Sequence, residues 1–237
     1  LLDTILRSHP SIEVIEEKPI VSNLINSLHE LQNGDLEGLK KIRKNEIQKI
    51  RKVYFDSLES EIKNIDNSKI YIDKLPLNII YVGEIFRIFP KAKFIISLRH
   101  PCDCVLSCFM QTFSINNAMA NFLNLEDSAK LYDLVMKLWI QYTSIFPINY
   151  YEVRYENLVE NLETTVKPLL KFLELPWHDS VLEFYKTAKK GPQIKTPSYD
   201  QVIKPIYSEA SGRWKMYKKQ TTNIYPILEP WIKKFNY

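Results

Sequence analysis

Hydrophobic residues recur at two different spacings along the chain. Short, almost continuous apolar runs predict β-strands at residues 12–17, 69–74, 93–99 and 149–155. Between these runs, apolar residues that lie three or four positions apart predict amphipathic helices. The predicted helices cover residues 1–8, 19–33, 35–64, 76–89, 101–112, 127–145 and 158–174, and helices and loops alone are expected from residue 178 onward.

This order of elements predicts the fold class. Strands that are separated by helices are typical of an α/β domain with a central, mainly parallel sheet that is flanked by helices. The run KFIISLR, residues 93–99, is apolar almost throughout, as expected when helices cover both faces of a strand. No repeat or low-complexity linker divides the chain, so we predict a single domain over residues 1–237.

Composition and charge limit the possible partners. The net charge is +4, which is too small to indicate nucleic-acid binding but suits an anionic small-molecule ligand. There is no run of 18 apolar residues, and we therefore predict no membrane-spanning helix. Three cysteines close together and the lack of any Asn-x-Ser/Thr site favour a reducing, cytoplasmic location.

The cysteines do not predict a metal site. Cys102, Cys104 and Cys108 lie near His100, but they include no C-x-x-C pair, and no second Cys/His group follows. We therefore expect no bound metal, and we interpret these residues as small apolar groups that pack one helix.

The stretch FIISLRHPCDCVLSCF, residues 94–109, indicates a phosphate site. Arg99 ends a predicted strand, Pro101 suits the first turn of a helix, and Ser107 lies two turns further on. Ligands collect at the carboxyl ends of parallel strands, where an arginine fork and a hydroxyl can bind one phosphate. The alternative is that Arg99 pairs with Asp103 and that Ser107 has no role.

Two further charged residues lie at the ends of predicted strands. Lys74 and Glu17 each end a strand, so they could reach the same rim of the sheet as a charge-stabilising cation and a general base. Taken alone, both would be ordinary surface charges. No G-x-x-x-x-G-K-[ST] loop is present, so an ATP-dependent activity would need its main motif elsewhere.

Four blocks of sequence, taken together, resemble the sulfotransferases that use 3′-phosphoadenosine 5′-phosphosulfate (PAPS). The resemblance is to the branch with tyrosylprotein sulfotransferases and the bacterial enzymes carried behind tetratricopeptide repeats. It implies a P-loop NTPase-like sulfotransferase fold. The blocks are LLDTILRSHPSIEVIEE, IDKLPLNIIYVGEIFRIFPKAKFIISLRHPCDCVLS, YEVRYENLVENLETTVKPLLKFLELPW and TPSYDQVIKPIYSEASGRWKMY, in the family's order.

The resemblance implies roles for four of these residues. Arg99 and Ser107 match the family's arginine and serine that bind the 3′-phosphate of the nucleotide. Lys74 matches the lysine that stabilises charge on the leaving phosphosulfate. Glu17 matches the acid that accepts the proton of the acceptor hydroxyl.

Three more residues match nucleotide contacts of the family. Tyr155 of R-Y-E corresponds to the tyrosine near the adenosine, and Lys204 and Ser198 belong to the segment around D-Q-V-I-K-P. Each has a simpler interpretation, in which Tyr155 packs beside the sheet and Lys204 is a loop charge. We interpret Trp214 as a core residue rather than a platform for substrate.

The resemblance also implies the reaction and its partners. We expect sulfuryl transfer from PAPS to a hydroxyl, with 3′-phosphoadenosine 5′-phosphate (PAP) as product and without a metal. An acidic, tyrosine-containing peptide is the favoured acceptor. A carbohydrate or small-molecule hydroxyl, a non-catalytic binding module, a homodimer and a Golgi location in a eukaryote remain alternatives.

The chain departs from the family pattern at its start. The family begins with a strand and a G-x-P-R-S-G-T-type loop that wraps the 5′-phosphosulfate, directly before a helix like LLDTILRSHP. We therefore expect a domain that is truncated at its N-terminus, with the loop and any tetratricopeptide repeats encoded upstream.

Overall fold

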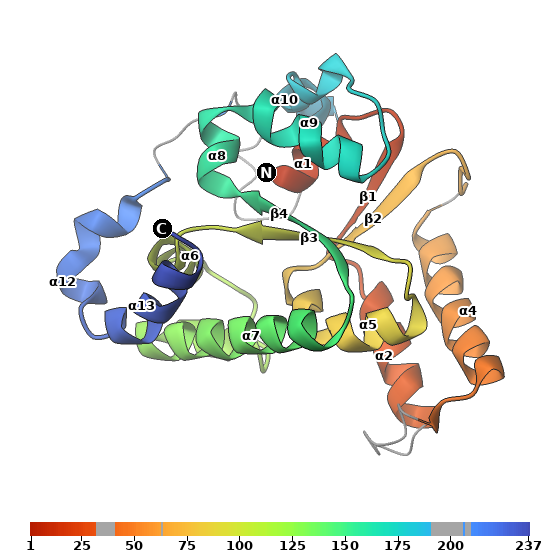
Figure 1. The fold of residues 1–237 in the computed structure, drawn as a ribbon, viewed down its shortest axis with the longest axis horizontal. Helices are drawn as coiled ribbons and strands as arrows, with labels where there is room; N and C mark the ends of the chain where they lie inside the picture. Colours follow the sequence, from red (N-terminus) through yellow and green to blue (C-terminus); the bar gives the residue numbers. More distant parts are fainter. Residues whose placement is uncertain (32–40, 63, 191–205, 207–209) are drawn as a thin grey trace.

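The computed structural model describes residues 1–31, 41–62, 64–190, 206 and 210–237. Helices pack on both faces of parallel strands, which confirms the predicted α/β fold class (Figure 1). No helix in these ranges is long and apolar enough to cross a membrane.

The four predicted strands are present, but they pair two by two. β1 (Ile12–Glu16) lies parallel to β2 (Ile70–Lys74), and β3 (Lys93–Leu98) lies parallel to β4 (Asn149–Arg154). Within the described residues no ladder joins one pair to the other. Because both pairs are parallel, the carboxyl ends of the two strands in each pair lie at the same edge.

One face of both strand pairs is covered by the same layer of helices, above the strands in Figure 1. Apolar side chains of β1 and β4, such as Val14 and Val153, join one core cluster with Leu169 and Phe184 of these helices. The helices of this layer are α1 (Leu2–Arg7), α8 (Tyr155–Glu160), α9 (Leu162–Phe172) and α10 (Phe184–Lys190).

The described residues form four further apolar clusters. Near β3 and β4, Trp139 and Trp231 pack with Leu98, and Cys102 belongs to a separate cluster. Leu24 belongs to a third cluster, and Ile15 of β1 to a small fourth one. The helices concerned are α6 (Pro101–Phe109), α7 (Leu125–Ile145) and α13 (Tyr225–Lys234) for the first two clusters, α2 (Ile20–Leu31) and α4 (Lys44–Glu61) for the last two, and α5 (Val82–Ile88) for the first and third.

Four short helical segments lie after β3 in the described chain. Three are 3₁₀-helices that precede or follow the longer helices, and the fourth begins directly after a 3₁₀ turn. They are η2 (Met119–Leu123), η3 (Asp179–Val181), η4 (Arg213–Tyr217) and α12 (Lys218–Thr221).

Local capping changes the limits of two of the predicted helices. The helix expected over 35–64 is interrupted at residues 42–43, and α4 starts at Lys44, because the Glu46 carboxylate accepts a hydrogen bond from the Arg43 amide at 2.6 Å and caps a new first turn. The helix expected over 158–174 is divided into α8 and α9, since Asn161 caps α9 through the Thr164 amide.

The helix expected over 76–89 begins with a 3₁₀ turn, η1 (Pro76–Tyr81), before α5 starts at Val82. Proline suits this first turn because it has no amide hydrogen to leave unpaired.

Candidate active site

Arg99 lies directly after β3, where the chain turns into α6. His100 accepts a hydrogen bond from the Cys102 amide and caps that helix, and Pro101 opens it, as predicted. The guanidinium stacks over the Tyr155 ring, with 4.8 Å from its central carbon to the ring centroid. The strand end therefore fixes Arg99 between the sheet and the first residue of α8.

The simpler interpretation of the sequence was an ion pair between Arg99 and Asp103. The structure contains no such pair, because both Asp103 oxygens accept hydrogen bonds from backbone amides. One terminal nitrogen of Arg99 donates to the Ala210 carbonyl at 2.6 Å. Its Nε is buried and has no hydrogen-bond partner in the part of the chain that is described. An unpaired buried donor costs about 1–3 kcal/mol, so an oxyanion that accepts from Nε would remove a penalty.

A cavity of about 260 Å³ adjoins this arginine. Ser107 of α6, Tyr155 of α8 and Leu1 at the start of α1 are among the residues that line it. A planar fork of donors, a hydroxyl and an aromatic ring are suitable groups for a phosphate carried by an aromatic base. The structure thus brings together Arg99, Ser107 and Tyr155, three of the predicted nucleotide ligands.

A second hollow, of about 550 Å³, lies over β4, α8 and α9. Its lining is mostly polar and includes Glu152, Arg154 and Asn161. None of the predicted site residues lines it, so the smaller cavity is the candidate site.

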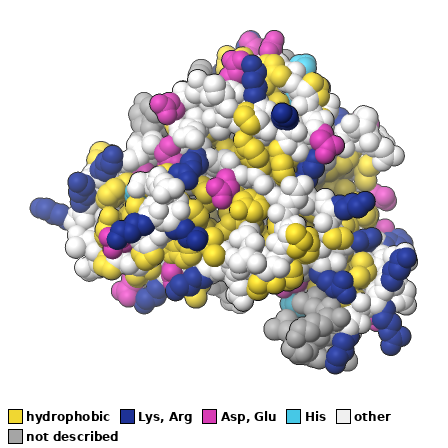
Figure 2. Space-filling model, in the orientation of Figure 1, with side chains coloured by type: hydrophobic (Ala, Val, Ile, Leu, Met, Phe, Trp, Pro, Cys, Tyr) yellow, Lys and Arg dark blue, Asp and Glu magenta, His cyan; other side chains and the backbone are white. Residues whose placement is uncertain are grey.

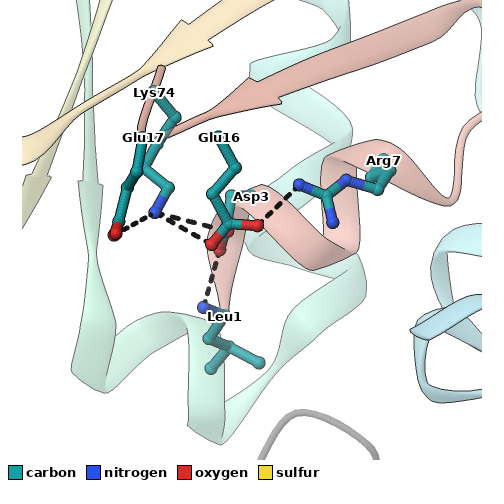
Figure 3. Close-up of polar contacts among 6 residues, drawn as sticks. All are labelled: Leu1, Asp3, Arg7, Glu16, Glu17 and Lys74. Carbon is teal, nitrogen blue, oxygen red and sulfur yellow. Dashed lines mark hydrogen bonds and ion pairs between the residues drawn. The ribbon is translucent and has the colours of Figure 1, made fainter. Parts of the chain in front are cut away.

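Lys74 and Glu17 meet at the carboxyl ends of β1 and β2 (Figure 3). Lys74 Nζ lies 3.0 Å from Glu17 Oε1, 3.0 Å from Glu16 Oε1 and 3.8 Å from Asp3 Oδ2. Glu16 also accepts a hydrogen bond from Arg7 at 2.8 Å. The lysine cation is therefore surrounded by three carboxylates from two distant segments.

Glu16 and Glu17 differ in exposure to solvent and in the number of cations that they contact. The Glu16 side chain is 14% exposed and bonded to two cations, whereas the Glu17 side chain is 46% exposed and, among the described residues, bonded only to Lys74. Glu17 also has a left-handed backbone with φ 54°. A non-glycine residue in this region is strained, and such strain is concentrated at functional sites.

Neighbouring charges keep Lys74 protonated. Burial opposes its charge, but Asp3, Glu16 and Glu17 together raise the pKa of the Lys74 ammonium above its usual value. Lys74 is thus a fixed cation at neutral pH.

The first residues of α1 connect the two groups of residues. Leu1 and Leu2 line the cavity beside Arg99, while Asp3, the next residue, contacts Lys74. The phosphate-type cavity and the lysine–carboxylate cluster are therefore neighbours on one rim of the fold. This rim could bind an anionic nucleotide on one side and accept a proton from a hydroxyl on the other.

Two predicted ligands cannot be assessed, because Ser198 and Lys204 lie outside the described residues. Sequence reasoning considered Asp103 only as an ion-pair partner of Arg99, and it assigned no role to Arg213 or Asp3. Asp103 is only 1% exposed and accepts hydrogen bonds from two distant backbone amides, and Arg213 lines the cavity. The only local signal was an acidic residue in the first turn after Pro101. Within the described ranges, no group of three or more His, Cys, Asp or Glu residues could hold a metal ion.

Comparison with known proteins is consistent with this geometry. The model of the sulfotransferase family matches residues 1–179. An uncharacterized protein of Aquifex aeolicus (strain VF5) is 32% identical over 249 residues, which cover 99% of this chain and 31% of the relative. Protein-tyrosine sulfotransferase 1 of Danio rerio is 27% identical over 229 residues, which cover 90% of this chain and 61% of the relative. The chain thus spans only part of these relatives.

Solved structures show the same fold. The sulfotransferase domain of the Synechococcus PCC 7002 olefin synthase superposes with a TM-score of 0.64 at 16% identity, covering 100% of this chain and 89% of that domain. The sulfotransferase domain from the curacin biosynthetic pathway gives a TM-score of 0.58 at 18% identity, covering 96% and 92% of the two chains.

We predict that Lys74→Met destabilises the fold in a pH-dependent way. Without the ammonium, three neighbouring carboxylates repel one another, and we expect a loss of about 1–2 kcal/mol in the free energy of unfolding at about pH 8. At about pH 5 the loss should be smaller, because proton uptake by the folded state relieves the repulsion. Urea unfolding at both pH values measures this difference.

Lys52→Met is the matched control for this prediction. Lys52 forms an exposed pair with Asp56 on α4, and its loss should leave the free energy of unfolding nearly unchanged at either pH, because solvent screens such a pair. An equal loss for Lys74→Met at both pH values would contradict the electrostatic role of Lys74.

Proposed function

The chain belongs to the sulfotransferase family, and from this premise we propose that it transfers a sulfuryl group from PAPS to an acceptor hydroxyl. The observation that carries the proposal is the cavity in which Arg99, Ser107 and Tyr155 meet. The buried, unpaired Nε of Arg99 supports an oxyanion as the ligand there. We propose that this oxyanion is the 3′-phosphate and that Tyr155 lies near the adenosine.

The lysine–carboxylate cluster would then perform the chemistry. The acceptor oxygen forms a bond to sulfur while the bond from sulfur to the bridging oxygen of the phosphosulfate breaks. Glu17 takes the hydroxyl proton, and the Lys74 ammonium stabilises the charge that grows on the bridging oxygen. The products are a sulfate ester and PAP, and no metal takes part in the proposed step.

A peptide tyrosine is the acceptor that we propose. The similarity to the protein-tyrosine sulfotransferases of Danio rerio and Drosophila melanogaster, which covers 90% of this chain in each case, supports it. A phenol has a pKa of about 10, so the Glu17 carboxylate need act only as the new bond forms.

The remaining expectations on domain structure stay proposals. We propose that residues 1–237 belong to one sulfotransferase domain. The shared core cluster supports this, since it contains residues of both strand pairs. Ser198 and Lys204 remain proposed nucleotide contacts, and a homodimer remains a prediction.

Nucleotide binding tests the proposed site directly. We expect PAP to bind, and Arg99→Ala to weaken its affinity by about 10- to 100-fold, because a charge-assisted fork to the phosphate is lost. Arg99→Lys should lie in between, since lysine keeps the charge without the fork. Calorimetry measures the affinities, on residues 1–237 and on the polypeptide in which they occur naturally.

The melting temperature of each variant without nucleotide controls for loss of folding. No binding of PAP to either form of the protein would overturn the proposed function.

Removal of the proposed base should separate chemistry from binding. We expect Glu17→Gln to lower the rate of sulfuryl transfer by about 100- to 10,000-fold, because an amide cannot accept the hydroxyl proton. PAP affinity should stay within about twofold of the parent value. Rapid-quench kinetics with ³⁵S-labelled PAPS measures the rate.

Glu13→Gln, near the start of β1 and paired with Lys69, is the matched control. Equal activity of Glu17→Gln and Glu13→Gln would exclude Glu17 as the base.

The acceptor class needs its own experiment. We expect label from ³⁵S-PAPS to enter tyrosine peptides flanked by acidic residues, and not the same peptides with phenylalanine in place of tyrosine. Glycans and small phenols are offered in parallel. Labelling of glycans alone would overturn the peptide proposal and leave sulfuryl transfer intact.

A further inference from the structure

Helix α7 carries apolar residues on two of its faces. One face packs into the cluster near β3 and β4, where Met136 and Trp139 are buried. A second face carries four aliphatic residues that belong to none of the five apolar clusters of the described chain. These residues, here named the α7 stripe, are Leu131, Leu134, Leu138 and Ile145.

The α7 stripe is open to solvent. Leu134 is 63% exposed and Ile145 is 60% exposed, while Leu131 and Leu138 are half-buried. Figure 2 shows hydrophobic side chains at the surface where Figure 1 draws α7. A single exposed leucine is ordinary in a globular protein, but an aligned row of aliphatic side chains indicates a contact surface.

The spacing of the stripe is that of a helix pair. Its members follow one another after three, four and seven positions, which are the spacings of the a and d positions in a heptad. A stripe this narrow fits the seam between two helices that pack side by side. It therefore suits a second helix with apolar residues at the same spacing.

The stripe is also complementary to itself. Leu131 and Ile145 each lie seven positions from Leu138, in opposite directions. If two copies of α7 pack antiparallel about a twofold axis at Leu138, Leu131 of each copy lies opposite Ile145 of the other. A second copy of the chain thus supplies the apolar row that the stripe requires.

The charges beside the stripe are compensated within α7. Lys130 lies 2.8 Å from a Glu126 oxygen, and Lys137 lies 2.7 Å from an Asp133 oxygen. Each pair joins residues four positions apart, so this flank of the helix brings no net charge. Two copies can therefore approach without repulsion between uncompensated lysines.

We infer that the α7 stripe is the contact surface of a homodimer, in which two α7 helices pack antiparallel about a twofold axis near Leu138. This gives the predicted homodimer a defined surface. The inference is independent of the proposed function, because no residue of the stripe lines the cavity beside Arg99.

The oligomeric state tests the inference, on residues 1–237 and on the polypeptide in which they occur naturally. We expect sedimentation velocity between about 1 and 200 µM to show a dimer that dissociates on dilution. Leu134→Lys should raise the dissociation constant by at least about 30-fold, because it places a charge in the middle of the seam.

Leu182→Lys is the matched control. Leu182 is 43% exposed and lies outside α7, so its replacement should change the dissociation constant by less than about twofold. Circular dichroism checks that both variants fold. PAP affinity should be the same in Leu134→Lys as in the parent chain, which separates this inference from the proposed function.

Crosslinking tests the twofold axis. With a short bismaleimide, Leu138→Cys should give a covalent dimer, because its two thiols would meet at the axis. Leu131→Cys should not, since the two copies of residue 131 would lie about 20 Å apart. The parent chain, with Cys102, Cys104 and Cys108, measures the background.

Three results would overturn the inference. The first is a monomer at every concentration, and the second is an equal dissociation constant for Leu134→Lys and Leu182→Lys. The third is a dimer of residues 1–237 alone, because another part of the natural polypeptide would then cover the stripe. Crosslinking of Leu131→Cys without Leu138→Cys would overturn the antiparallel arrangement.

Discussion

The parallel register of β1 and β2 places Glu16 opposite Lys74 at the carboxyl ends of both strands. This pairing places Lys74 next to Glu17, the residue after Glu16. It also places Lys74 near Asp3 of α1. A lysine in such surroundings keeps its proton, and a carboxylate beside it can approach a hydroxyl. The catalytic half of the proposed mechanism therefore depends on one strand register.

The nucleotide half depends on contacts between parts of the chain that are far apart in sequence. Arg99 follows a buried strand and is held by the Tyr155 ring and the Ala210 carbonyl. Asp103 fixes the chain after Ala210 through two backbone amides. Such a site is preorganised, because its donors are placed before the ligand arrives.

The sequence predicted the features that depend on local patterns of residues. All four strands lie where apolar runs placed them, and Lys74, Glu17 and Arg99 end or follow strands as expected. The limits of the helices were predicted less accurately. A single capping residue such as Asn161 can begin a new helix even where the apolar spacing continues without a break. The division into two strand pairs and the role of Asp103 depend on contacts between distant segments, which no local pattern contains.

We propose that this rim of the fold binds the nucleotide of a sulfuryl transfer, and a crystal structure with PAP bound would test this. We expect a 3′-phosphate oxygen within hydrogen-bond distance of Arg99 Nε and Ser107 Oγ, with the 5′-phosphate directed toward Lys74. A nucleotide bound in the hollow over β4 and α8, or with its 3′-phosphate away from Arg99, would contradict it.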